Sequence, residues 1–439
     1  MLFLSIDFGT SSVKMSVMDQ HLDIKQTAKV DYPYIILPGE KYEINPEELF
    51  KGLYAAANQL DPDLRKQVEI VCYDTFSPSP VFIKKDGSLS YPNIITHMDR
   101  RSRQQTQYII DHFGKDEYLN ITGFYPFAGG AGFMTVCWFM QNAYDYLDKT
   151  YRIGHLPTYI HHELTGEWVV DLVNASMLGL YETTKQSAWS KQIIDAFQLK
   201  PDWFGEIFNP GTLCGNLLPD QAARLGLKSG IPVAVGTNDM AAAQVGAGNK
   251  EAGRIMNTAG SSDMVSILTD KPIVNPNYYL RNAAMPGLWQ IYATTAGGFA
   301  IDWFYSQFCL DMNKDYFYHE FIENSLNEWK EDGEVVFDPY LTGDRQSLDK
   351  KTGAWRGLTL AATREEMLAA MLKSMNRVLN GTIREASQFV ELNDTIKLTG
   401  GMSTQKYIDL KSREIPGFNF EVVDNCSILG NVELVKMYL

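Results

Sequence analysis

The sequence predicts an α/β fold that is built from two related halves. The N-terminal segment is typical of two strands followed by a helix, an order that α/β domains use. A second strand–turn–strand segment with the same kind of turn begins near residue 255. With 439 residues the chain is also long enough for two or three domains, each with its own apolar core.

The first predicted element is a hairpin with a polar tip. β-Branched and apolar residues occupy positions 2–6 and 13–18, and the turn between them reads Asp7-Phe8-Gly9-Thr10-Ser11-Ser12. A helix is then predicted after Asn45, which supplies an N-cap, with Pro46 at the first helical position and apolar residues at helical spacing beyond it.

The second half repeats this hairpin. Residues 231–235 have the pattern of a short buried strand, a turn follows over 236–239, and an Ala-rich helix begins at Met240. A second hairpin is predicted over 255–267, and its turn matches the first one at a constant offset of 251 residues. The offset places Gly9 on Gly260, Thr10 on Ser261 and Ser11 on Ser262.

Two further elements are predicted near the C-terminus. Thr363 and Glu366 form a capping-box pattern, and the helix that follows has an apolar face that reaches to Gly381. A strand over 396–398 ends in Thr399-Gly400-Gly401 and precedes a further helix. Such a junction is typical of places where a nucleotide contacts the backbone.

Charge and composition exclude several classes of function. Lys and Arg number 39 and Asp and Glu number 53, so the net charge is −14, which disfavours nucleic acid and anionic membranes as partners. A small phosphorylated ligand is still compatible, because backbone N–H groups and Mg²⁺ can hold phosphates. Neither a membrane span nor a signal peptide is indicated, so a cytoplasmic location is expected.

The side chains that commonly bind metals do not suggest a metal site. The five cysteines include no C-x-x-C pair, so they are predicted to be buried, reduced thiols. His161-His162-Glu163 lacks the H-E-x-x-H spacing, and we expect it on a solvated helical face. The cysteines are Cys72, Cys137, Cys214, Cys309 and Cys426.

The turn at residues 9–12 is suited to phosphate oxygens. It offers backbone N–H groups and hydroxyls, Asp7 can hold Mg²⁺ through water, and Lys14 adds positive charge. An ordinary hairpin turn, in which the serines only satisfy the backbone, is the alternative. The repeat at Gly260-Ser261-Ser262 favours phosphate binding, since two facing hairpins can clamp one polyphosphate.

Asp239 is the predicted catalytic carboxylate. It lies where a strand meets a helix, which is the usual place for such a group at the mouth of an α/β sheet. A helix N-cap is the alternative role for this residue. Gly246-Ala247-Gly248 follows a helix instead of opening one, and no P-loop motif occurs, so dehydrogenases and P-loop NTPases are disfavoured.

Taken in order, these motifs resemble those of the FGGY carbohydrate kinases, which belong to the actin, heat-shock chaperone and hexokinase superfamily. The resemblance rests on residues 7–14, 236–242 and 260–262, and it spans nearly the whole chain. Other family-like stretches are residues 97–102, Leu164-Thr165-Gly166-Glu167, Asp171 with Ala175-Ser176, residues 339–345 and Thr399-Gly400-Gly401.

The resemblance implies two ribonuclease-H-like domains of the actin-like ATPase type with a cleft between them, expected at residues 1–229 and 230–439. It also implies that the γ-phosphoryl group of ATP, with Mg²⁺, is transferred to a hydroxyl of a small ketose, polyol or sugar acid. Asp7 and Asp239 are expected to be linked to Mg²⁺, and Asp239 to act as the base. ATP is expected at Gly9, Thr10, Ser11, Ser12, Lys14, Gly260, Ser261, Ser262, Gly400 and Gly401.

The expected acceptor pocket departs from the family. Ser77-Pro78-Ser79 stands where xylulose kinases show Met-His-Gly and glycerol kinases show Arg-Glu-Thr, and His97 replaces a tryptophan. Xylulose and glycerol are therefore expected to be poor acceptors. The adenosine segment reads Gly400-Gly401-Met402-Ser403-Thr404, without the Arg-Ser of the family, and the family's late Gly-Ala-Ala reads Gly430-Asn431-Val432 here. The residues expected to contact the acceptor are Ser77, His97, Asp99, Arg101, Asp239 and Met240.

A non-catalytic nucleotide- or sugar-binding protein on the same fold is the alternative function, and the altered adenosine segment motivates it. The joint presence of Asp7, Lys14 and Asp239 favours a kinase, since a binding protein has no need of a base. The expected partner is a small sugar or polyol, and a homodimer is compatible with the sequence.

Overall fold

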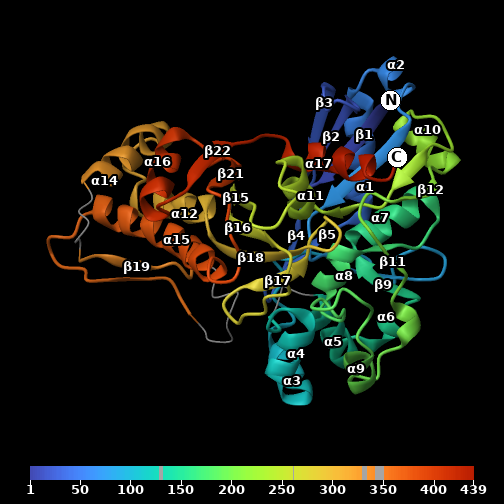
Figure 1. Ribbon diagram of the computed structural model, residues 1–439, viewed down its shortest axis with the longest axis horizontal. Coiled ribbons are helices and arrows are strands. Elements are labelled where there is room, and N and C mark those ends of the chain that lie inside the picture. Colours follow the sequence, from blue (N-terminus) through green and yellow to red (C-terminus); the bar gives the residue numbers. More distant parts are fainter. Residues whose placement is uncertain (128–131, 261, 329–333, 342–350) are drawn as a thin grey trace.

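Two mixed β-sheets form the framework of the chain. The computed structural model describes residues 1–127, 132–260, 262–328, 334–341 and 351–439. The first sheet, in blue, lies on the right of Figure 1, and the second, in yellow to red, lies left of centre. The sheets therefore belong to two separate parts of the molecule, as a fold of two halves requires.

The first sheet has the strand order β12-β13-β6-β1-β2-β3, and the short β14 also pairs with β6. β1 pairs antiparallel with β2 and parallel with β6, so that Asp7 lies opposite both Lys14 and Asp74. Polar side chains from three neighbouring strands thus meet near one edge. The strands are β1 Leu2–Phe8, β2 Ser12–Asp19, β3 Ile24–Asp31, β6 Ile70–Thr75, β12 Leu213–Asn216, β13 Pro232–Ala234 and β14 Thr237–Asn238.

The second sheet has the order β17-β18-β16-β15-β21-β22. β15 pairs antiparallel with β16 and parallel with β21, and β22 runs parallel to β21. This arrangement repeats that of β1, β2, β6 and β13 in the first sheet, which confirms the predicted relation between the halves. The strands are β15 Ile255–Ala259, β16 Ser262–Thr269, β17 Tyr279–Asn282, β18 Trp289–Ala296, β21 Thr395–Thr399 and β22 Asn419–Val422.

Equivalent helices cover the two sheets. α1 (Pro46–Gln59) packs on β2 and β3, and α15 (Arg364–Ala386) packs on β16 and β18. Both predicted caps are present: Asn45 Oδ1 accepts from the Glu47 N–H at 2.8 Å, and Thr363 forms a capping box with Glu366. The predicted end at Gly381 is wrong, because α15 continues to Ala386 and its buried face continues with it.

A lobe formed by residues 76–212, here called the inserted lobe, separates β6 from β12 and lies below the first sheet in Figure 1. It has its own core, in which Phe133, Phe139 and Trp203 are buried. Its elements are β7 Pro80–Ile83, β8 Ile94–Ile95, α3 Arg103–Phe113, α4 Lys115–Thr122, α5 Gly132–Asn142, α6 Tyr144–Asp148, β9 Arg152–His155, α7 Leu156–Thr165, β10 Val170–Asp171, α8 Leu172–Leu178, α9 Lys191–Ala196, the 3-10 helix Pro201–Trp203 and β11 Ile207–Phe208.

The remaining elements connect or cover these parts. In the first half they are β4 Ile35–Leu37, β5 Lys41–Ile44, α2 Pro62–Arg65, α10 Pro219–Leu225 and α11 Asp239–Gly246. In the second half they are α12 Gly298–Phe308, α13 Lys314–Tyr316, the π-helix Phe317–Phe321, α14 Ile322–Glu328, β19 Val336–Asp338, β20 Ala354–Arg356, α16 Gln405–Glu414 and α17 Cys426–Lys436.

The predicted boundary between residues 229 and 230 does not follow the sheets. β13 and β14 lie after that boundary, yet both pair with β6 of the first sheet. The C-terminal helix α17 also returns to the first half, where it packs on β1, β6 and α11. The reason is that β13 pairs parallel with β6 and so belongs to the first sheet. The chain therefore passes into the second half only after α11.

Two predictions about single side chains have different outcomes. All five cysteines are free thiols, and four of them are buried, as expected; Cys214 is partly exposed. The predicted solvated face at His161 is wrong: this imidazole is completely buried in α7 and contacts the Tyr73 hydroxyl at 3.2 Å and the Cys214 carbonyl at 2.8 Å. Burial lowers the pKa of His161 to about 4.

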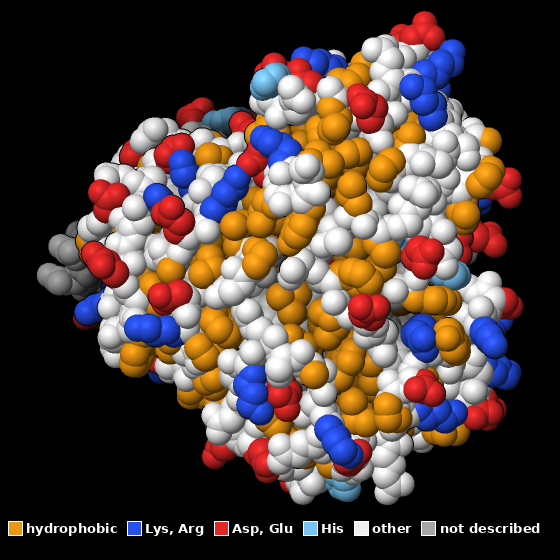
Figure 2. Space-filling view, turned by 45° about the vertical axis from the view of Figure 1, so that its right-hand side comes forward, with side chains coloured by type: hydrophobic (Ala, Val, Ile, Leu, Met, Phe, Trp, Pro, Cys, Tyr) orange, Lys and Arg blue, Asp and Glu red, His pale blue; other side chains and the backbone are white. Residues whose placement is uncertain are grey.

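The surface shows charges of both signs. In Figure 2 acidic and basic side chains are mixed across the visible face, and hydrophobic side chains gather toward its middle. This face therefore presents no basic area of the kind that nucleic acid requires. Within the described ranges, no helix combines the length and the apolar character needed to cross a bilayer.

Candidate active site

Three carboxylates, one buried and two half-buried, lie near one another at the ends of neighbouring elements of the first half. Asp7 is the penultimate residue of β1, Asp74 lies opposite it on β6, and Asp239 opens α11 directly after β14, which also pairs with β6. The carboxyl ends of parallel strands meet at the same edge of a sheet, and that is where α/β enzymes place their reactive groups.

Asp7 and Asp74 form a hydrogen-bonded pair of carboxyl groups. Burial raises the pKa of Asp74 well above its ordinary value, and the negative charges of Asp7 and Asp239 raise it further. Burial also raises the pKa of Asp7, although hydrogen bonds from Asp74 and Ser427 oppose the effect. The pKa of Asp74 is therefore raised more strongly than that of Asp7. Asn431 of α17 supports Asp74 with a hydrogen bond of 2.5 Å.

Asp239 is not the N-cap of its helix. The cap is Asn238, whose side-chain oxygen accepts from the Ala241 N–H at 3.3 Å. The Oδ1 atom of Asp239 accepts from Asn238 Nδ2 and from the Met240 N–H, both at 2.7 Å, and no hydrogen bond to Oδ2 is found within the described residues. Burial, followed by the charge of Asp7, raises the pKa of Asp239 to about 7. One oxygen of a weakly acidic carboxylate thus remains available to a ligand.

The first predicted phosphate loop, residues 9–12, connects β1 and β2. The Tyr32 hydroxyl donates to the Gly9 carbonyl, and the Tyr32 N–H donates to the Ser11 carbonyl at 3.0 Å, so two carbonyls of the loop are held from one side. Lys14 lies opposite Asp7 on β2 and donates to Asn425 at 2.6 Å, next to the start of α17. These contacts leave loop N–H groups and the side chain of Ser11, which is exposed, for a ligand.

The second predicted phosphate loop, residues 260–262, connects β15 and β16, and Ser261 lies outside the described residues. The Gly260 carbonyl accepts from the N–H of Gly298 at the start of α12, at 2.8 Å. Gly400 has a φ of 106°, and a Cβ atom there would overlap the Ala259 carbonyl, so only glycine fits against this loop. A Cβ atom at Gly401 would meet no described atom within 4 Å, which leaves its backbone open to a ligand.

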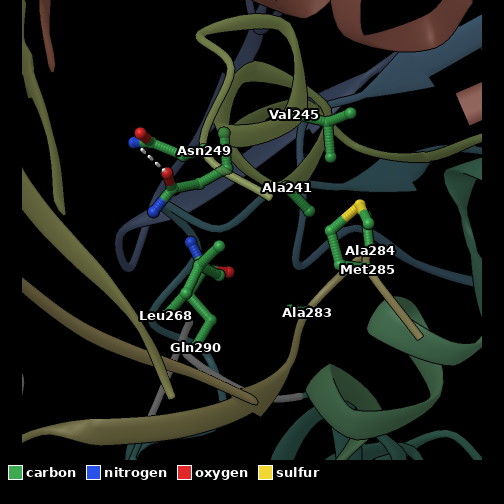
Figure 3. A pocket seen from close by; sticks show the side chains of 9 residues that line it. Ala241, Val245, Asn249, Leu268, Ala283, Ala284, Met285 and Gln290 are labelled. Atoms are coloured by element: carbon green, nitrogen blue, oxygen red, sulfur yellow. Dashed lines mark hydrogen bonds between the residues drawn. The ribbon is translucent and has the colours of Figure 1, made fainter. Parts of the chain in front are cut away.

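α11 connects the first carboxylate cluster with the second sheet. Thr258, two residues before the second loop, donates to the sulfur of Met240 at 3.2 Å. Behind the helix, Gln244 accepts from Asn249 at 2.7 Å and donates to the Ser266 carbonyl at 3.1 Å (Figure 3). The hollow between Gln244 and the sheet has no room for a water molecule. Asp239 is therefore held on an element that touches both halves.

A chain of hydrogen bonds joins Ser77 to the strand before Asp239. Asp171 accepts from the N–H of Asn174 at 3.1 Å, from its amide nitrogen at 2.7 Å and from the Thr237 hydroxyl at 2.8 Å. The amide oxygen of Asn174 must then face Ser77, whose hydroxyl donates to it at 2.7 Å. Since that proton is committed, the half-buried Ser77 oxygen can only accept a hydrogen bond from a ligand.

The side chains of Asp99 and Arg101 form hydrogen bonds with each other, so their polar atoms are used within the protein. The Arg101 guanidinium donates to Asp99 at 2.9 and 2.8 Å and forms an ion pair with Glu43, and its side chain is only 1% exposed. This geometry favours a structural role, so their predicted contact with the acceptor has no support here. His97 is half-buried, with its ring 6.4 Å from that of Phe76.

Two residues that the sequence did not indicate belong to the site. Asp74 is one, and its signal was a lone carboxylate inside the apolar run of β6. Arg281 of β17 is the other: it is 7% exposed, and its guanidinium carbon lies 4.4 Å from the ring centre of Tyr292. Burial lowers the pKa of Arg281, and the nearby Tyr292, Tyr279 and Asp239 oppose this shift. A single Arg in an apolar strand was the available signal.

The donor atoms around Asp7 and Asp239 fit Mg²⁺ better than a softer metal. They are carboxylate oxygens, and one buried oxygen of Asp74 has no hydrogen-bond partner. Among the described residues no three His, Cys, Asp or Glu side chains are close enough to enclose an ion.

Comparisons with known proteins relate this chain to one family of enzymes. The sequence pattern of the N-terminal domain of the FGGY family of carbohydrate kinases matches residues 2–246. The chain is 22% identical to a gluconokinase of Bacillus subtilis over 85% of this chain and 74% of the relative. It is 25% identical to a xylulose kinase of Lactococcus lactis over 96% of this chain and 83% of the relative.

Solved structures show the same fold. A gluconate kinase from Lactobacillus acidophilus superposes with a TM-score of 0.89 at 18% identity, covering 100% of this chain and 89% of that one. A ligand-bound xylulose kinase from the same organism has a TM-score of 0.88, also at 18% identity, with the same coverage of both chains.

Proposed function

The chain belongs to the FGGY family of carbohydrate kinases, and on that basis we propose that Asp239 is the base in the transfer of the γ-phosphoryl group of ATP to a hydroxyl of a small carbohydrate. The observation that carries the proposal is the Asp239 carboxylate: it is half-buried, no hydrogen bond to its Oδ2 is found among the described residues, and desolvation raises its pKa to about 7. A group that gains or loses a proton near neutral pH is suited to general-base work.

The chain's own residues would divide the work as follows. Asp239 orients the acceptor hydroxyl and accepts its proton late, because phosphoryl transfer has a loose transition state. Residues 9–12 and 260–262 would hold the phosphates, and Gly400 and Gly401 would face the adenosine. Kinases of this family use ATP with Mg²⁺, and that ion neutralises phosphate charge; Asp7 would hold it through water.

The acceptor itself needs an experiment. The relatives include a gluconokinase and a xylulose kinase, whose names indicate different acceptors. ADP release should be measured for a panel of ketoses, alditols and sugar acids. We expect turnover with at least one of these classes of acceptor. For xylulose and glycerol we expect low kcat/KM, because the side chains of Ser77-Pro78-Ser79 are short and supply few hydrogen-bond donors to a sugar. High kcat/KM for either would contradict the pocket assignment.

The same panel separates the kinase from the alternative. A non-catalytic protein on this fold would bind a nucleotide or a sugar without turnover. Among the described residues no hydrogen bond to Asp239 Oδ2 is found, which leaves this oxygen for a reacting hydroxyl, and a pure binding site has no need of such a base. Binding of ATP and a sugar with no ADP release from any acceptor would favour the alternative.

We expect the acceptor and the nucleotide to tighten each other's binding. The two phosphate loops belong to different sheets, so contact with one triphosphate requires the halves to approach, and closure also excludes water from the reaction. The two affinities should rise by the same factor, about tenfold. Calorimetric titration of a non-hydrolysable ATP analogue, with and without the acceptor, measures it; independent binding would contradict closure on a shared ligand.

A further inference from the structure

Arg281 is a largely buried cation, and no side-chain hydrogen bond of it is found among the described residues. The residue is 7% exposed, and no hydrogen bond or ion pair of its guanidinium is found in the part of the chain that the structure describes. Its recorded contacts are the faces of Tyr292 and Tyr279, with the guanidinium carbon 4.4 and 5.8 Å from the ring centres. An aromatic face attracts a cation but does not satisfy its N–H donors.

The position of Arg281 points to the acceptor side of the site. β17 is the edge strand of the second sheet, and β18 separates it from β16, which carries the second phosphate loop. The free edge of β17 is bonded to the inserted lobe: Leu280 N–H donates to the Gly123 carbonyl at 2.9 Å, and Asn282 N–H donates to Ser176 at 3.2 Å. Arg281, between these two residues, therefore lies on the side of Asp239 that faces the inserted lobe.

The charges around Arg281 are few. Asp239 is the acidic group that acts on it, and Arg281 in turn acts on the buried imidazole of His155 in the inserted lobe. Desolvation disfavours the charged form of the guanidinium, and partner oxygens from a ligand would offset that cost. If Asp239 is occupied with the reacting hydroxyl, the guanidinium still has donors for another oxygen pair.

We propose that Arg281 binds a carboxylate of the acceptor, which makes the acceptor a sugar acid. The inference rests on the proposed kinase function and narrows its substrate class. A planar guanidinium matches the two oxygens of a carboxylate, and such charge-assisted pairs are stronger than bonds to neutral hydroxyls. The hydroxyls of the same molecule find an acceptor in Ser77, whose own proton is committed to Asn174.

The test uses acceptor pairs that differ only at one carbon. Gluconate is compared with glucitol, and glycerate with glycerol, because each pair exchanges a carboxylate for a hydroxymethyl group. We expect the wild type to favour the acid in kcat/KM. Arg281→Gln should lower kcat/KM for the acid by roughly 10²-fold and change that for the alditol less than about threefold. Arg281→Lys keeps the charge and should recover part of the loss.

Controls separate this role from others. Arg254→Gln removes a partly exposed arginine that pairs with Glu251 at 3.4 Å, and it should change neither acceptor. Calorimetric titration of gluconate in the absence of nucleotide measures its binding independently of turnover. Titration of ADP and thermal melting test whether each variant is folded. An equal loss for acid and alditol, or a raised KM for ATP with both, would overturn the proposal.

The outcomes also distinguish this inference from the function beneath it. Turnover of ketoses or alditols, with no binding of gluconate or glycerate, would overturn the carboxylate assignment and leave the kinase intact. Arg281-dependent binding of gluconate without any turnover would support the carboxylate site and contradict the kinase proposal.

Discussion

Replacing Asp239 with asparagine is expected to lower kcat by about 10²–10⁴-fold while nucleotide and acceptor still bind. The substitution keeps the shape of the side chain and its Oδ1 contacts with Asn238 and Met240, but it removes the group that accepts the proton. Steady-state kinetics, combined with calorimetric titration of both ligands, measures the split between catalysis and binding. Near-normal kcat would remove Asp239 from the mechanism.

The pH dependence gives a second readout for the same residue. Burial and the charge of Asp7 raise the pKa of Asp239 to about 7, and a base acts only when it has lost its proton. The wild-type rate should therefore rise with pH through about 7, and the residual activity of Asp239→Asn should lack this step. Asn238→Asp should move this step to higher pH, because it keeps the helix cap but replaces the amide that donates to Asp239 Oδ1 with a second carboxylate.

Much of the fold follows from local patterns in the sequence. The two hairpins, the Asn45 cap and the Thr363 capping box depend on residues that are close in the chain, and the structure confirms them. The position of Asp239 at a strand-to-helix junction is confirmed for the same reason. Its role as the base stays a prediction until the variant is measured.

Other features depend on contacts between distant segments. Asp74 joins the carboxylate cluster only because β6 pairs in register with β1. Arg281 is held through the pairing of β17 with β18 and its packing on α8, and the buried His161 finds hydrogen-bond partners in Tyr73 and the Cys214 carbonyl. No local pattern indicates these pairings. The domain boundary was misplaced for the same reason, since strand pairing assigns β13 to the first sheet.

The C-terminal helix shows the same effect at Gly430. The sequence aligned Gly430-Asn431-Val432 with an adenosine motif, but the structure places Gly430 where α17 crosses α11. A Cβ atom at Gly430 would overlap the Ala242 carbonyl, and one at Gly246 would overlap the Cys426 carbonyl. The two glycines therefore let the helix backbones touch, and α17 can bring Ser427 and Asn431 to the carboxylates of the first sheet.

Gly430→Ala is expected to destabilise the fold by about 3 kcal/mol or more, because the added methyl group meets backbone on the facing helix, which cannot rotate away as a side chain can. Separation of the helices would also move Asp239 on α11 relative to Asp7, so kcat should fall in the fraction that stays folded.

Gly381→Ala is the matched control. Gly381 lies inside α15, and a new Cβ atom there would meet no described atom within 4 Å, so alanine should stabilise the helix by roughly 0.5–1 kcal/mol. Urea unfolding of both variants measures the difference. If Gly430→Ala is as stable as the wild type, α11 and α17 can accommodate a methyl group at their crossing, and the prediction is wrong.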